Sequence, residues 1–575
     1  MKASYERWRQ LISVARGLEK AQLCFRNVRI VNPLTGQIEE TDFAVHDGII
    51  VGLGNYDAVE NIDCRGSYAA PGFIEGHIHI ESSLLIPERF AEAVVPWGTT
   101  TVIADPHEIA NVCGMEGIRY FLEAAGMVEH LVDIFVMLPS CVPASPLETS
   151  GASLNAVDLY ELAGHKRVLG LGELMNFPGV LGANREIWEK VFLFGDCHID
   201  GHSPLLSGKD LNAYVLSGVR SDHECTKLEE AREKLARGMW IMIREGSQSK
   251  DLEALIGLVD DTTWHRCLWV SDDRHPDDLL RRGHLNVQVN RAMEFGLSPV
   301  RALALASWTP ALAFGLRDRG ALLPGTIADF SLSPTLKPWV PHRVFKRGRE
   351  VSHDGKVIEP CNGRARKPTN PMKIASVDRS HFAVKAEGTM IRVIGIREHS
   401  ILTDHLVEPA LIKDGLVVSD PERDILKVAV WNRYEPGALP AVGFCKGLGL
   451  KEGAIASTVA HDNHNLIVAG ISDDLMALAA DTLRKRGGGL AVVDRKGAVL
   501  DLPLEVAGLM TDSPLENVAR RLDELKSKAQ ELGSKVENPF MALSFLALPV
   551  IPSLKITDRG LVDVEKFAFV SLFAD

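Results

Sequence analysis

The alternation of hydrophobic and polar positions changes along this chain, and each change predicts a different kind of structure. Residues 1–20 carry apolar side chains at helical spacing, so we expect an amphipathic helix in an N-terminal extension over residues 1–22. Residues 23–70 show short apolar runs separated by turn residues, which predicts β-strands. The same pattern returns over residues 320–360, and we expect both segments to form one small β-sandwich domain.

Between these segments, short apolar runs alternate with helical patterns over residues 71–319. The runs lie at residues 99–104, 132–138, 168–171, 239–243 and 267–270. Continuous apolar runs of this length are typical of strands buried on both faces of a parallel sheet. Repeated strand–helix units therefore predict an α/β architecture, a TIM-like (β/α)8 barrel inserted into the β-sandwich domain.

The remainder of the chain predicts a linker and a third domain. Residues 361–371 are basic and contain prolines, as linkers often do. Residues 375–575 mix strand and helix patterns, which predicts a C-terminal α+β domain. Its clearest helix should begin at Ser513 as N-cap, with Pro514 at the first position and Glu516 closing a capping box.

Composition and charge narrow the class of protein. A chain of 575 residues exceeds the roughly 250–300 at which one core stops growing, so several domains are expected. The formal charge of −13 argues against nucleic acid or an anionic membrane as main partner. Nine scattered cysteines, no signal peptide and no membrane-spanning apolar stretch predict a soluble cytoplasmic protein with reduced thiols.

The strongest chemical signal is the pair His77-Ile-His79 after a short apolar run. Side chains two residues apart on a strand point to the same face, as two ligands of one metal ion must. The alternative is a pair of histidines in a satisfied polar pocket.

Other predicted strands also end in metal-ligand residue types. Glu173, His202 and His223 each follow a strand or turn, and the run at residues 267–270 leads into Asp272 and Asp273. Each has an ordinary alternative as a helix cap or turn residue. Together they favour two ions bridged by a carboxylate, because the functional face of a parallel barrel lies at the carboxyl ends of its strands.

These stretches resemble the amidohydrolase superfamily. The resemblance rests on Pro71-Gly-Phe-Ile-Glu-Gly-His-Ile-His and on Pro324-Gly-Thr-Ile-Ala-Asp. More specifically, the chain from about residue 23 onward is similar to the bacterial adenine deaminase family. The matching stretches are His77 to Ser83, Asp105 to Val112, Gly172 to Asn176, Asp200 to Pro204, Ser221 to Glu224, Ser271 to Arg274 and Ala460 to Asn465.

The resemblance implies a ligand set. His77, His79 and Asp272 would hold one divalent ion, His202 and His223 the other, and Glu173 would bridge them. The family is associated with Mn(II) or Fe(II), and nitrogen and oxygen ligands would also accept Zn(II). The implied reaction is hydrolysis of adenine to hypoxanthine and ammonia by a metal-bridging hydroxide, in purine salvage.

The resemblance also suggests further roles. Asp272 or Asp273 would carry the proton from water to the leaving amine, and the second of the two would face a purine nitrogen. Glu81 or Glu108 would protonate a ring nitrogen. The remaining residues expected to line the site are Ser82, Ser83, Asp105, His107, His461, Asp462 and His464. A turn fixed by Pro106 and a structural histidine cluster are the alternatives for residues 105–108 and 461–464.

Two other functions remain open at this point. One is another ring amidohydrolase, such as a hydantoinase or dihydropyrimidinase, which a lysine at the bridging position would have favoured. The other is a catalytically silent scaffold, which missing ligands would have marked. We also expect the chain to form a homo-oligomer, a dimer or higher.

Overall fold

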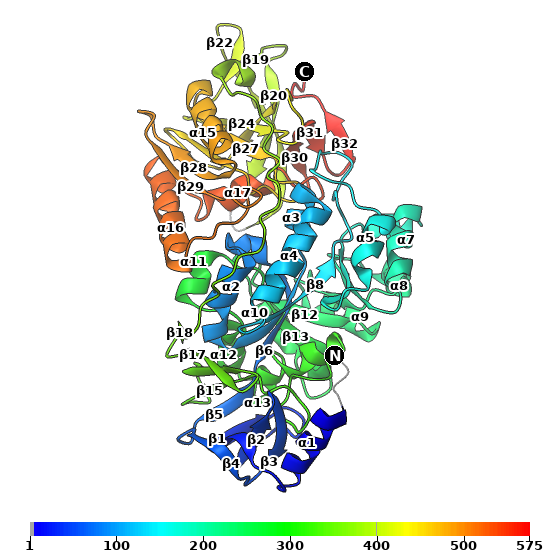
Figure 1. Ribbon diagram of the computed structural model, residues 1–575. Helices are drawn as coiled ribbons and strands as arrows, with labels where there is room; N and C mark the ends of the chain where they lie inside the picture. Colours follow the sequence, from blue (N-terminus) through cyan, green and yellow to red (C-terminus); the bar gives the residue numbers. More distant parts are fainter. Residues whose placement is uncertain (1–4, 398–399) are drawn as a thin grey trace.

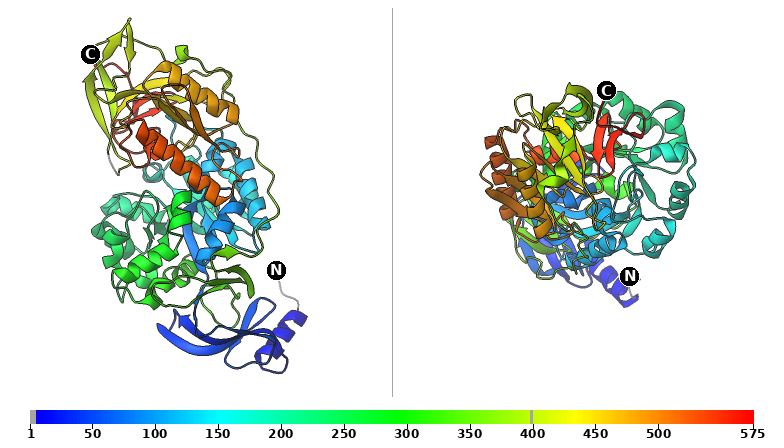
Figure 2. Two further views of the ribbon diagram at one scale, coloured as in Figure 1. Left: turned by 90° about the vertical axis from the view of Figure 1, so that its left-hand side faces the viewer. Right: turned by 90° about the horizontal axis from the view of Figure 1, so that it is seen from above.

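The computed structural model describes residues 5–397 and 400–575 and shows three parts stacked along one axis (Figure 1). The N-terminal strands lie at one end, the strand–helix units lie in the middle, and the C-terminal region lies at the opposite end (Figure 2). The first four residues of the predicted extension lie outside the described residues. Residues 5–15 of the extension form helix α1 (Tyr5–Ala15), whose Leu11 and Val14 pack against the N-terminal sheet. The helix is shorter than predicted, and residues 21–22 of the extension already belong to the first strand of that sheet.

One sheet combines strands from both ends of the barrel segment. The strands are β1 (Ala21–Asn32), β2 (Gln37–His46), β3 (Ile49–Leu53), β4 (Ala58–Asp63), β5 (Tyr68–Pro71), β15 (Phe330–Ser333), β16 (Arg343–Lys346), β17 (Arg349–His353) and β18 (Lys356–Val357). Their order is β18-β17-β16-β15-β5-β1-β2-β3, with β4 paired to β1. Residues on both sides of the barrel segment therefore share one nine-stranded sheet.

Four phenylalanines hold the two parts of this sheet together. Phe25 stacks on Phe43, and Phe330 stacks on Phe345, at centroid distances of 4.8 and 4.6 Å. The first pair meets the second edge to face, with Phe25 4.9 Å from Phe330. Edge-to-face and offset pairs of this kind each add about 0.5–1.5 kcal/mol beyond area burial. These aromatic contacts thus join the two chain segments that flank the barrel in the sequence.

Eight parallel strands form the barrel. They are β6 (Phe73–His79), β7 (Thr99–Ala104), β8 (Asp133–Leu138), β9 (Val168–Leu174), β10 (His198–Gly201), β11 (Ser221–Asp222), β12 (Trp240–Arg244) and β13 (Cys267–Val270). β14 (Asp272–Asp273) continues β13 and pairs in parallel with β6, which closes one seam. At the other seam, between β10 and β11, the N–H of Arg220 donates to the carbonyl of Ile199 at 3.0 Å.

Helices surround the strands and fill one end of the barrel. They are α2 (Pro87–Val94), α3 (His107–Cys113), α4 (Met115–Met127), α5 (Ala156–Ala163), α6 (Phe177–Leu181), α7 (Arg185–Leu193), α8 (Gly208–Leu216), α9 (Leu228–Ala236), α10 (Leu252–Leu255), α11 (Pro276–Arg281), α12 (Asn286–Glu294), α13 (Pro299–Ala304) and α14 (Trp308–Ala313). Ile74, Ile103, Met137 and Met242 pack with Phe314 in one apolar cluster. The carboxyl ends of the strands are left for polar side chains.

The segment predicted as a linker has no regular secondary structure and runs along the barrel. The N–H of Cys361 donates to Glu92, and Arg364 pairs with Asp512 at 2.7 Å. Beyond it lies an eight-stranded sheet of order β21-β20-β25-β24-β27-β26-β28-β29. Its strands are β20 (Met390–Ile396), β21 (Thr403–Pro409), β24 (Ile425–Trp431), β25 (Ala441–Lys446), β26 (Ala454–Ser457), β27 (Leu466–Gly470), β28 (Gly489–Val493) and β29 (Val499–Pro503).

Three helices and two small sheets complete this C-terminal region. The helices are α15 (Asp473–Arg486), α16 (Leu515–Glu531) and α17 (Pro539–Phe545). The small sheets contain β19 (Val384–Lys385), β22 (Leu411–Lys413) and β23 (Leu416–Val418), and β30 (Leu554–Thr557), β31 (Gly560–Asp563) and β32 (Ala568–Val570). α16 buries Val518, Leu522 and Leu525 as predicted, but its capping box was wrong: the N-cap is Pro514, without a side-chain bond.

The fold class predicted from the sequence is confirmed as a parallel barrel joined to two further sheet-containing parts. The domain boundaries at residues 22, 70, 319 and 375 stay a prediction. Within residues 5–397 and 400–575, no helix is both long and apolar enough to cross a membrane. All nine cysteines have free thiols.

Candidate metal centre

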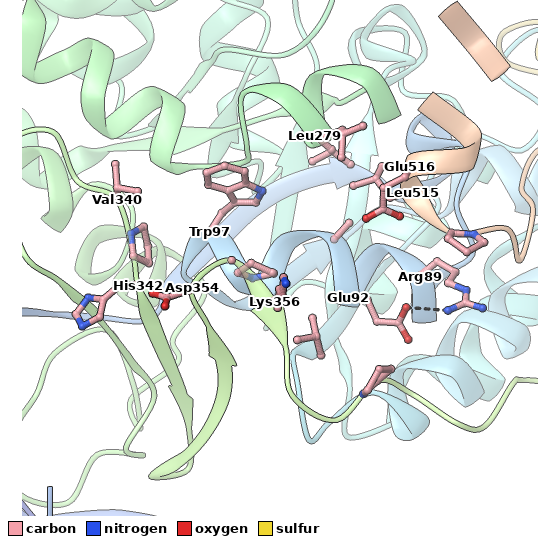
Figure 3. Close-up of a pocket in the computed structure, with 18 of the residues that line it drawn as sticks. Arg89, Glu92, Trp97, Leu279, Val340, His342, Asp354, Lys356, Leu515 and Glu516 are labelled. Carbon is pink, nitrogen blue, oxygen red and sulfur yellow. Dashed lines mark hydrogen bonds and ion pairs between the residues drawn. The ribbon is translucent and has the colours of Figure 1, made fainter. Parts of the chain in front are cut away.

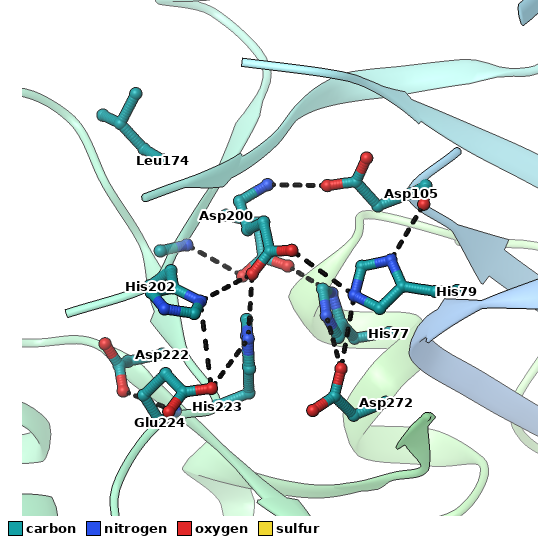
Figure 4. A network of polar contacts seen from close by, with 12 residues as sticks. His77, His79, Asp105, Leu174, Asp200, His202, Asp222, His223, Glu224 and Asp272 are labelled. Carbon is teal, nitrogen blue, oxygen red and sulfur yellow. Dashed lines mark hydrogen bonds and ion pairs between the residues drawn. The ribbon is translucent and has the colours of Figure 1, made fainter. Parts of the chain in front are cut away.

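Two histidines at the end of β6 begin the site. β6 is buried over its whole length and pairs with β7 on one side and β14 on the other. The rings of His77 and His79 lie 4.9 Å apart between centroids. His77 Nε2 is 3.6 Å and His79 Nε2 is 3.2 Å from the same oxygen, Asp272 Oδ1. Both Nε2 atoms therefore face one carboxylate, as the alternation along a strand predicts (Figure 4).

Each of these imidazoles has a partner on its outer nitrogen. His77 Nδ1 lies 2.9 Å from Asp200 Oδ2, and His79 Nδ1 lies 3.0 Å from the backbone carbonyl of Asp105. A carbonyl accepts only, so His79 Nδ1 carries a proton and its Nε2 presents a lone pair to the centre. A carboxylate partner fixes His77 in the same way. Metal-ligating histidines are oriented by such outer acceptors.

Glu173 lies at the centre of the cluster. β9 delivers its carboxylate to four imidazoles from four separate parts of the barrel. The distances are 3.3 Å to His79, 3.3 Å to His107, 2.7 Å to His202 and 3.1 Å to His223. Oε1 faces the first two rings and Oε2 the last two, so the two oxygens serve opposite sides of the site.

His202 and His223 come from the ends of β10 and β11. Both rings face a second carboxylate, Glu224, at 3.8 and 3.6 Å. Arg244, at the end of β12, pairs with Glu224 and also reaches Asp272 Oδ2 at 3.1 Å. This buried guanidinium links the carboxylates beside the two histidine pairs. It was not predicted, although a charged residue ending a buried strand was the same signal that identified Glu173.

The acidic pair Asp272–Asp273 divides between two neighbourhoods. Asp272 faces His77, His79 and Arg244, so both of its oxygens are engaged. Asp273 accepts a hydrogen bond from the hydroxyl of Ser82 instead. The backbone of β14 pairs Asp273 with His79 and Asp272 with Ile78. One member therefore faces the histidine cluster, and the other faces the serine turn.

The site attracts positive charge. Burial alone would lower the pKa of His77, but the nearby carboxylates of Asp200 and Asp272 raise that pKa well above the ordinary value. Burial would raise the pKa of Glu173, yet the surrounding imidazoles, His202 foremost, lower it well below. The pKa of Asp200 falls to about 2, because His77 outweighs the effect of burial. The carboxylates thus remain anionic around a centre that binds protons or cations.

The side chains present fit a divalent-metal site. Four of the groups of three potential ligands found among the described residues overlap here, and each keeps its ligand atoms within 4.8 Å of one another. They are His77–His79–Asp272, His77–Glu173–His223, His79–His107–Glu173 and His202–His223–Glu224. His77 Nε2 is buried without a hydrogen-bond partner. Nitrogen and oxygen donors without thiolate suit Mn, Fe or Zn ions.

The remaining predicted barrel residues lie around this centre in different ways. Glu81 is buried, accepts from the N–H of Ile109 at 3.1 Å, and has a second oxygen without a partner. Burial and the charge of Glu108 raise its pKa to about 7. The Asp105 carboxylate accepts from the N–H of Glu173 at 2.9 Å. Ser83 lies apart, because its hydroxyl donates to the carbonyl of Ile80 within the turn.

A second carboxylate–histidine group lies where the C-terminal region meets the barrel. Glu108, at the start of α3, lies 2.7 Å from His461 and contacts His464 through its other oxygen. All three side chains are buried, as is Asp462, whose Oδ2 has no partner. The connection from β26 to β27 supplies His461, Asp462 and His464. The predicted cluster therefore reaches the barrel from a segment more than 350 residues away in the sequence.

A separate cavity lies away from this centre. It has a volume of about 640 Å³ and is lined by side chains of α2, α11, α16 and the β16–β18 region, including Trp97, Leu279, Val340 and Leu515 (Figure 3). Two of its ionisable groups, Arg89 and Glu92, pair with each other at 2.9 Å. It has no converging ligand set. The narrower pocket beside Ser82, His275 and His461 borders the chemistry instead.

Asp200, Glu224 and Arg244 were not predicted as site residues. Asp200 and Glu224 belong to the stretches Asp200-Gly-His202 and His223-Glu224 that predicted the histidines. Glu224 directly follows the proposed ligand His223, and Asp200 lies two residues before the proposed ligand His202. This proximity in the sequence could have identified both residues. Their function as partners of ligands depends on contacts between different strands, so the sequence alone did not single them out.

Two known families match parts of this chain. The amidohydrolase family matches residues 68–351, and the adenine deaminase C-terminal domain matches residues 400–568. A protein of Syntrophobacter fumaroxidans named adenine deaminase is 56% identical over 577 aligned positions, covering 100% of both chains. One of Carboxydothermus hydrogenoformans named adenine deaminase 2 is 45% identical and covers 98% of this chain and 99% of its own.

Solved structures resemble the chain over a smaller part. The β-aspartyl dipeptidase of Fervidobacterium islandicum, bound to a β-Asp-Leu dipeptide, is 16% identical with a TM-score of 0.45. The match covers 59% of this chain and 98% of that one.

Proposed function

This chain belongs to the adenine deaminase family of amidohydrolases, and we propose that it hydrolyses adenine to hypoxanthine and ammonia at the cluster around Glu173. In this reaction water adds to C6 of the purine, and the C6–amine bond then breaks. The enzyme is a hydrolase that acts on a carbon–nitrogen bond and takes a small-molecule substrate.

A divalent metal centre is implied by the amidohydrolase family and by the overlapping ligand groups. We propose two ions per chain, Mn(II) or Fe(II), with Zn(II) as a chemically acceptable substitute. His77, His79 and Asp272 would hold one, His202 and His223 the other, and Glu173 would contribute to both. Such ions lower the pKa of water so that hydroxide is available near neutral pH.

The acidic pair would handle the proton. Asp272 lies against both histidines of β6, so it is the base placed to take a proton from the attacking water and return it to the departing amine. Arg244 holds the second oxygen of this carboxylate and fixes its orientation. Asp273, held by Ser82, would accept a hydrogen bond from an N–H of the purine ring.

Glu81 is the group we propose for the ring nitrogen beside C6. One oxygen is fixed by the N–H of Ile109, and the other is buried and free to face the substrate. A proton shared with that nitrogen makes C6 more electrophilic. Glu108, the alternative from the sequence, has its oxygens in contact with His461 and His464 and is less suited to this role. Asp105 and His107, which contact Glu173, would line the part of the site beside that residue.

The observation that carries this proposal is the position of Glu173, with four histidines between 2.7 and 3.3 Å from its two oxygens. A lysine would be required there for the carbamylated bridge of many other amidohydrolases, so the hydantoinase alternative loses its support. The silent-scaffold alternative loses support too, because every ligand expected from the family is present.

The test is ammonia release from adenine, adenosine and a hydantoin by Mn(II)-reconstituted protein. Turnover of adenine without turnover of the hydantoin would support the assignment. Metal-loaded protein that leaves adenine unchanged would rule out this substrate while leaving the fold intact. Metal analysis of the same sample should give about two ions per chain.

We further propose that the enzyme works in the cytoplasm in purine salvage, as a homo-oligomer without nucleic-acid or membrane partners. The formal charge of −13 and the free thiols support this setting. The size of the purified protein, by light scattering, tests the oligomer.

A further inference from the structure

His461 lies where the C-terminal region meets the barrel mouth, and its ring nitrogen Nε2 has no hydrogen-bond partner. Residues 460–465 connect β26 to β27, and the loop is fixed on several sides. The N–H of His461 donates to Ser544 at 3.1 Å, and Asn465 donates to the carbonyl of Thr149 at 2.8 Å. His461 also stacks on Phe545 with centroids 5.3 Å apart. The ring is therefore held in one place.

Glu108, His461 and His464 meet the spacing criterion for a further metal site, but the hydrogen bonds argue against one. The N–H of Ala460 donates to His464 Nδ1 at 3.2 Å. Because Nδ1 accepts, the proton of neutral His464 is on Nε2, the atom that faces Glu108. A nitrogen that carries a proton donates a hydrogen bond and has no lone pair for an ion.

The same reasoning orients His461. Its Nδ1 lies 2.7 Å from Glu108 Oε1, so Nδ1 donates to that carboxylate. Nε2 is left buried and without a partner. His461 lines the pocket shared with Ser82 and His275, on the side of the site where Ser82 holds Asp273. The chain of contacts therefore runs from the Ala460 N–H through His464 and Glu108 to an unpartnered imidazole nitrogen of a residue that lines this pocket.

We propose that His461 contacts the substrate directly and donates a hydrogen bond from Nε2 to a ring nitrogen of the purine, with Glu108 and His464 as positioning residues. This inference rests on the proposed function. It gives the C-terminal region a part in recognition, since the barrel alone would lack this donor. It also separates the two glutamates: Glu81 faces the substrate, and Glu108 acts through His461.

Charge supports a donor at this position. Although burial lowers the pKa of His461, Glu108 and Asp273 raise it to about 9, so the ring carries both protons at neutral pH. For His464, burial outweighs Glu108 and lowers the pKa to about 4, so that ring stays neutral. Burial would raise the pKa of Glu108, but the imidazoles, His461 foremost, lower it well below the ordinary value. The His461 cation and the Glu108 anion thus lie beside the neutral ring of His464.

The test compares His461→Asn with His461→Gln in the full-length, metal-loaded protein. Asn retains an amide near the Nδ1 position but loses Nε2, whereas Gln places an amide N–H near the Nε2 position. We expect His461→Asn to lower kcat/KM for adenine by about 10- to 100-fold, the range of a hydrogen bond to a charged group. His461→Gln should recover part of that loss. His405→Asn, in β21 of the same C-terminal sheet, is the matched control.

Inhibition by 1-, 3- and 7-deazaadenine distinguishes a contact from a structural role. One of these compounds lacks the nitrogen that His461 contacts, so it should bind the wild type and His461→Asn about equally, while the others bind the variant more weakly. Equal weakening of all three, or an unchanged kcat/KM in the variant, would overturn the inference. A third bound ion that disappears in His461→Asn would overturn it too. Wild-type protein inactive on adenine would instead refute the proposed function.

Discussion

Two buried carboxylates in this protein each meet a set of histidines, yet the surroundings assign them different chemistry. Glu173 lies among four imidazoles inside the barrel, and Glu108 lies between two at the contact with the C-terminal region. Both carboxylates contact their imidazoles directly, so contact alone does not separate the two clusters. The difference lies in what each imidazole does with its outer nitrogen.

Beside Glu173, the outer partners of the two β6 histidines, His77 and His79, accept protons. A backbone carbonyl faces His79 Nδ1 and a carboxylate faces His77 Nδ1, which leaves lone pairs toward the centre. In the Glu108 cluster a backbone N–H donates to the outer nitrogen of His464, so a proton points inward. The first arrangement suits an ion and the second a hydrogen-bond chain. One backbone contact thus distinguishes a ligand from a positioning residue.

The largest effect is expected for Glu173→Gln. The variant loses a negative charge that both proposed ions would share, and each such ion would supply several kcal/mol of catalysis. We expect kcat/KM for adenine to fall by at least about 1,000-fold, with metal content reduced. Glu186→Gln, on the exposed side of α7, is the control. A Glu173→Gln protein that retains both ions and near-normal turnover would remove Glu173 from the centre.

A smaller loss is expected for Asp200→Asn. The amide keeps the shape of the side chain but no longer places a negative charge 2.9 Å from His77 Nδ1. Loss of such an outer partner typically costs about 10- to 100-fold in metal affinity or activity. Titration with Mn(II) followed by activity measures it. Full activity at low Mn(II) would show that His77 needs no acceptor, and the contrast between the clusters would lose its basis.

Patterns within short segments predicted much of this protein. The runs at residues 99–104 and 267–270 coincide with β7 and β13, because strands buried on both faces consist mainly of apolar and β-branched residues without charged ones. β10 and β11 did not stand out. They are short and include His198, Asp200, Ser221 and Asp222, whose polar side chains belong to the site or its supports. Their strand geometry comes from neighbours in the barrel.

The same limit applies to the candidate site. The histidines and Glu173 could be predicted because each ends a strand, and strand ends meet at one face of a barrel. The bond from the Ala460 N–H to His464 could not, because it depends on how one loop folds over the barrel mouth. Nor could Arg244 be paired with Glu224 and Asp272, which are brought together only when the strands close the barrel.

His464→Leu should have a moderate effect of a different kind. It removes the inner N–H that holds Glu108, so His461 is positioned less well. We expect up to about a tenfold loss in kcat/KM, which is the cost of about one ordinary hydrogen bond, with unchanged metal content. His464→Gln retains a donor and should recover activity. If His464→Leu instead loses an ion, the Glu108 cluster belongs with the metal centre and the comparison fails.

The smallest effect, in Ser82→Ala, decides to which cluster Asp273 belongs. Asp273 follows the proposed metal ligand Asp272 in the sequence, yet its carboxylate accepts from Ser82, which lines the same pocket as His461. If it serves the substrate, losing this hydrogen bond should raise KM for adenine a few-fold, since one such bond contributes about 0.5–1.5 kcal/mol, and leave the Mn(II) titration unchanged. Ser83→Ala is the control, because its hydroxyl binds only within its own turn. A Ser82→Ala protein with weaker Mn(II) binding and unaltered KM would place Asp273 with Glu173 instead.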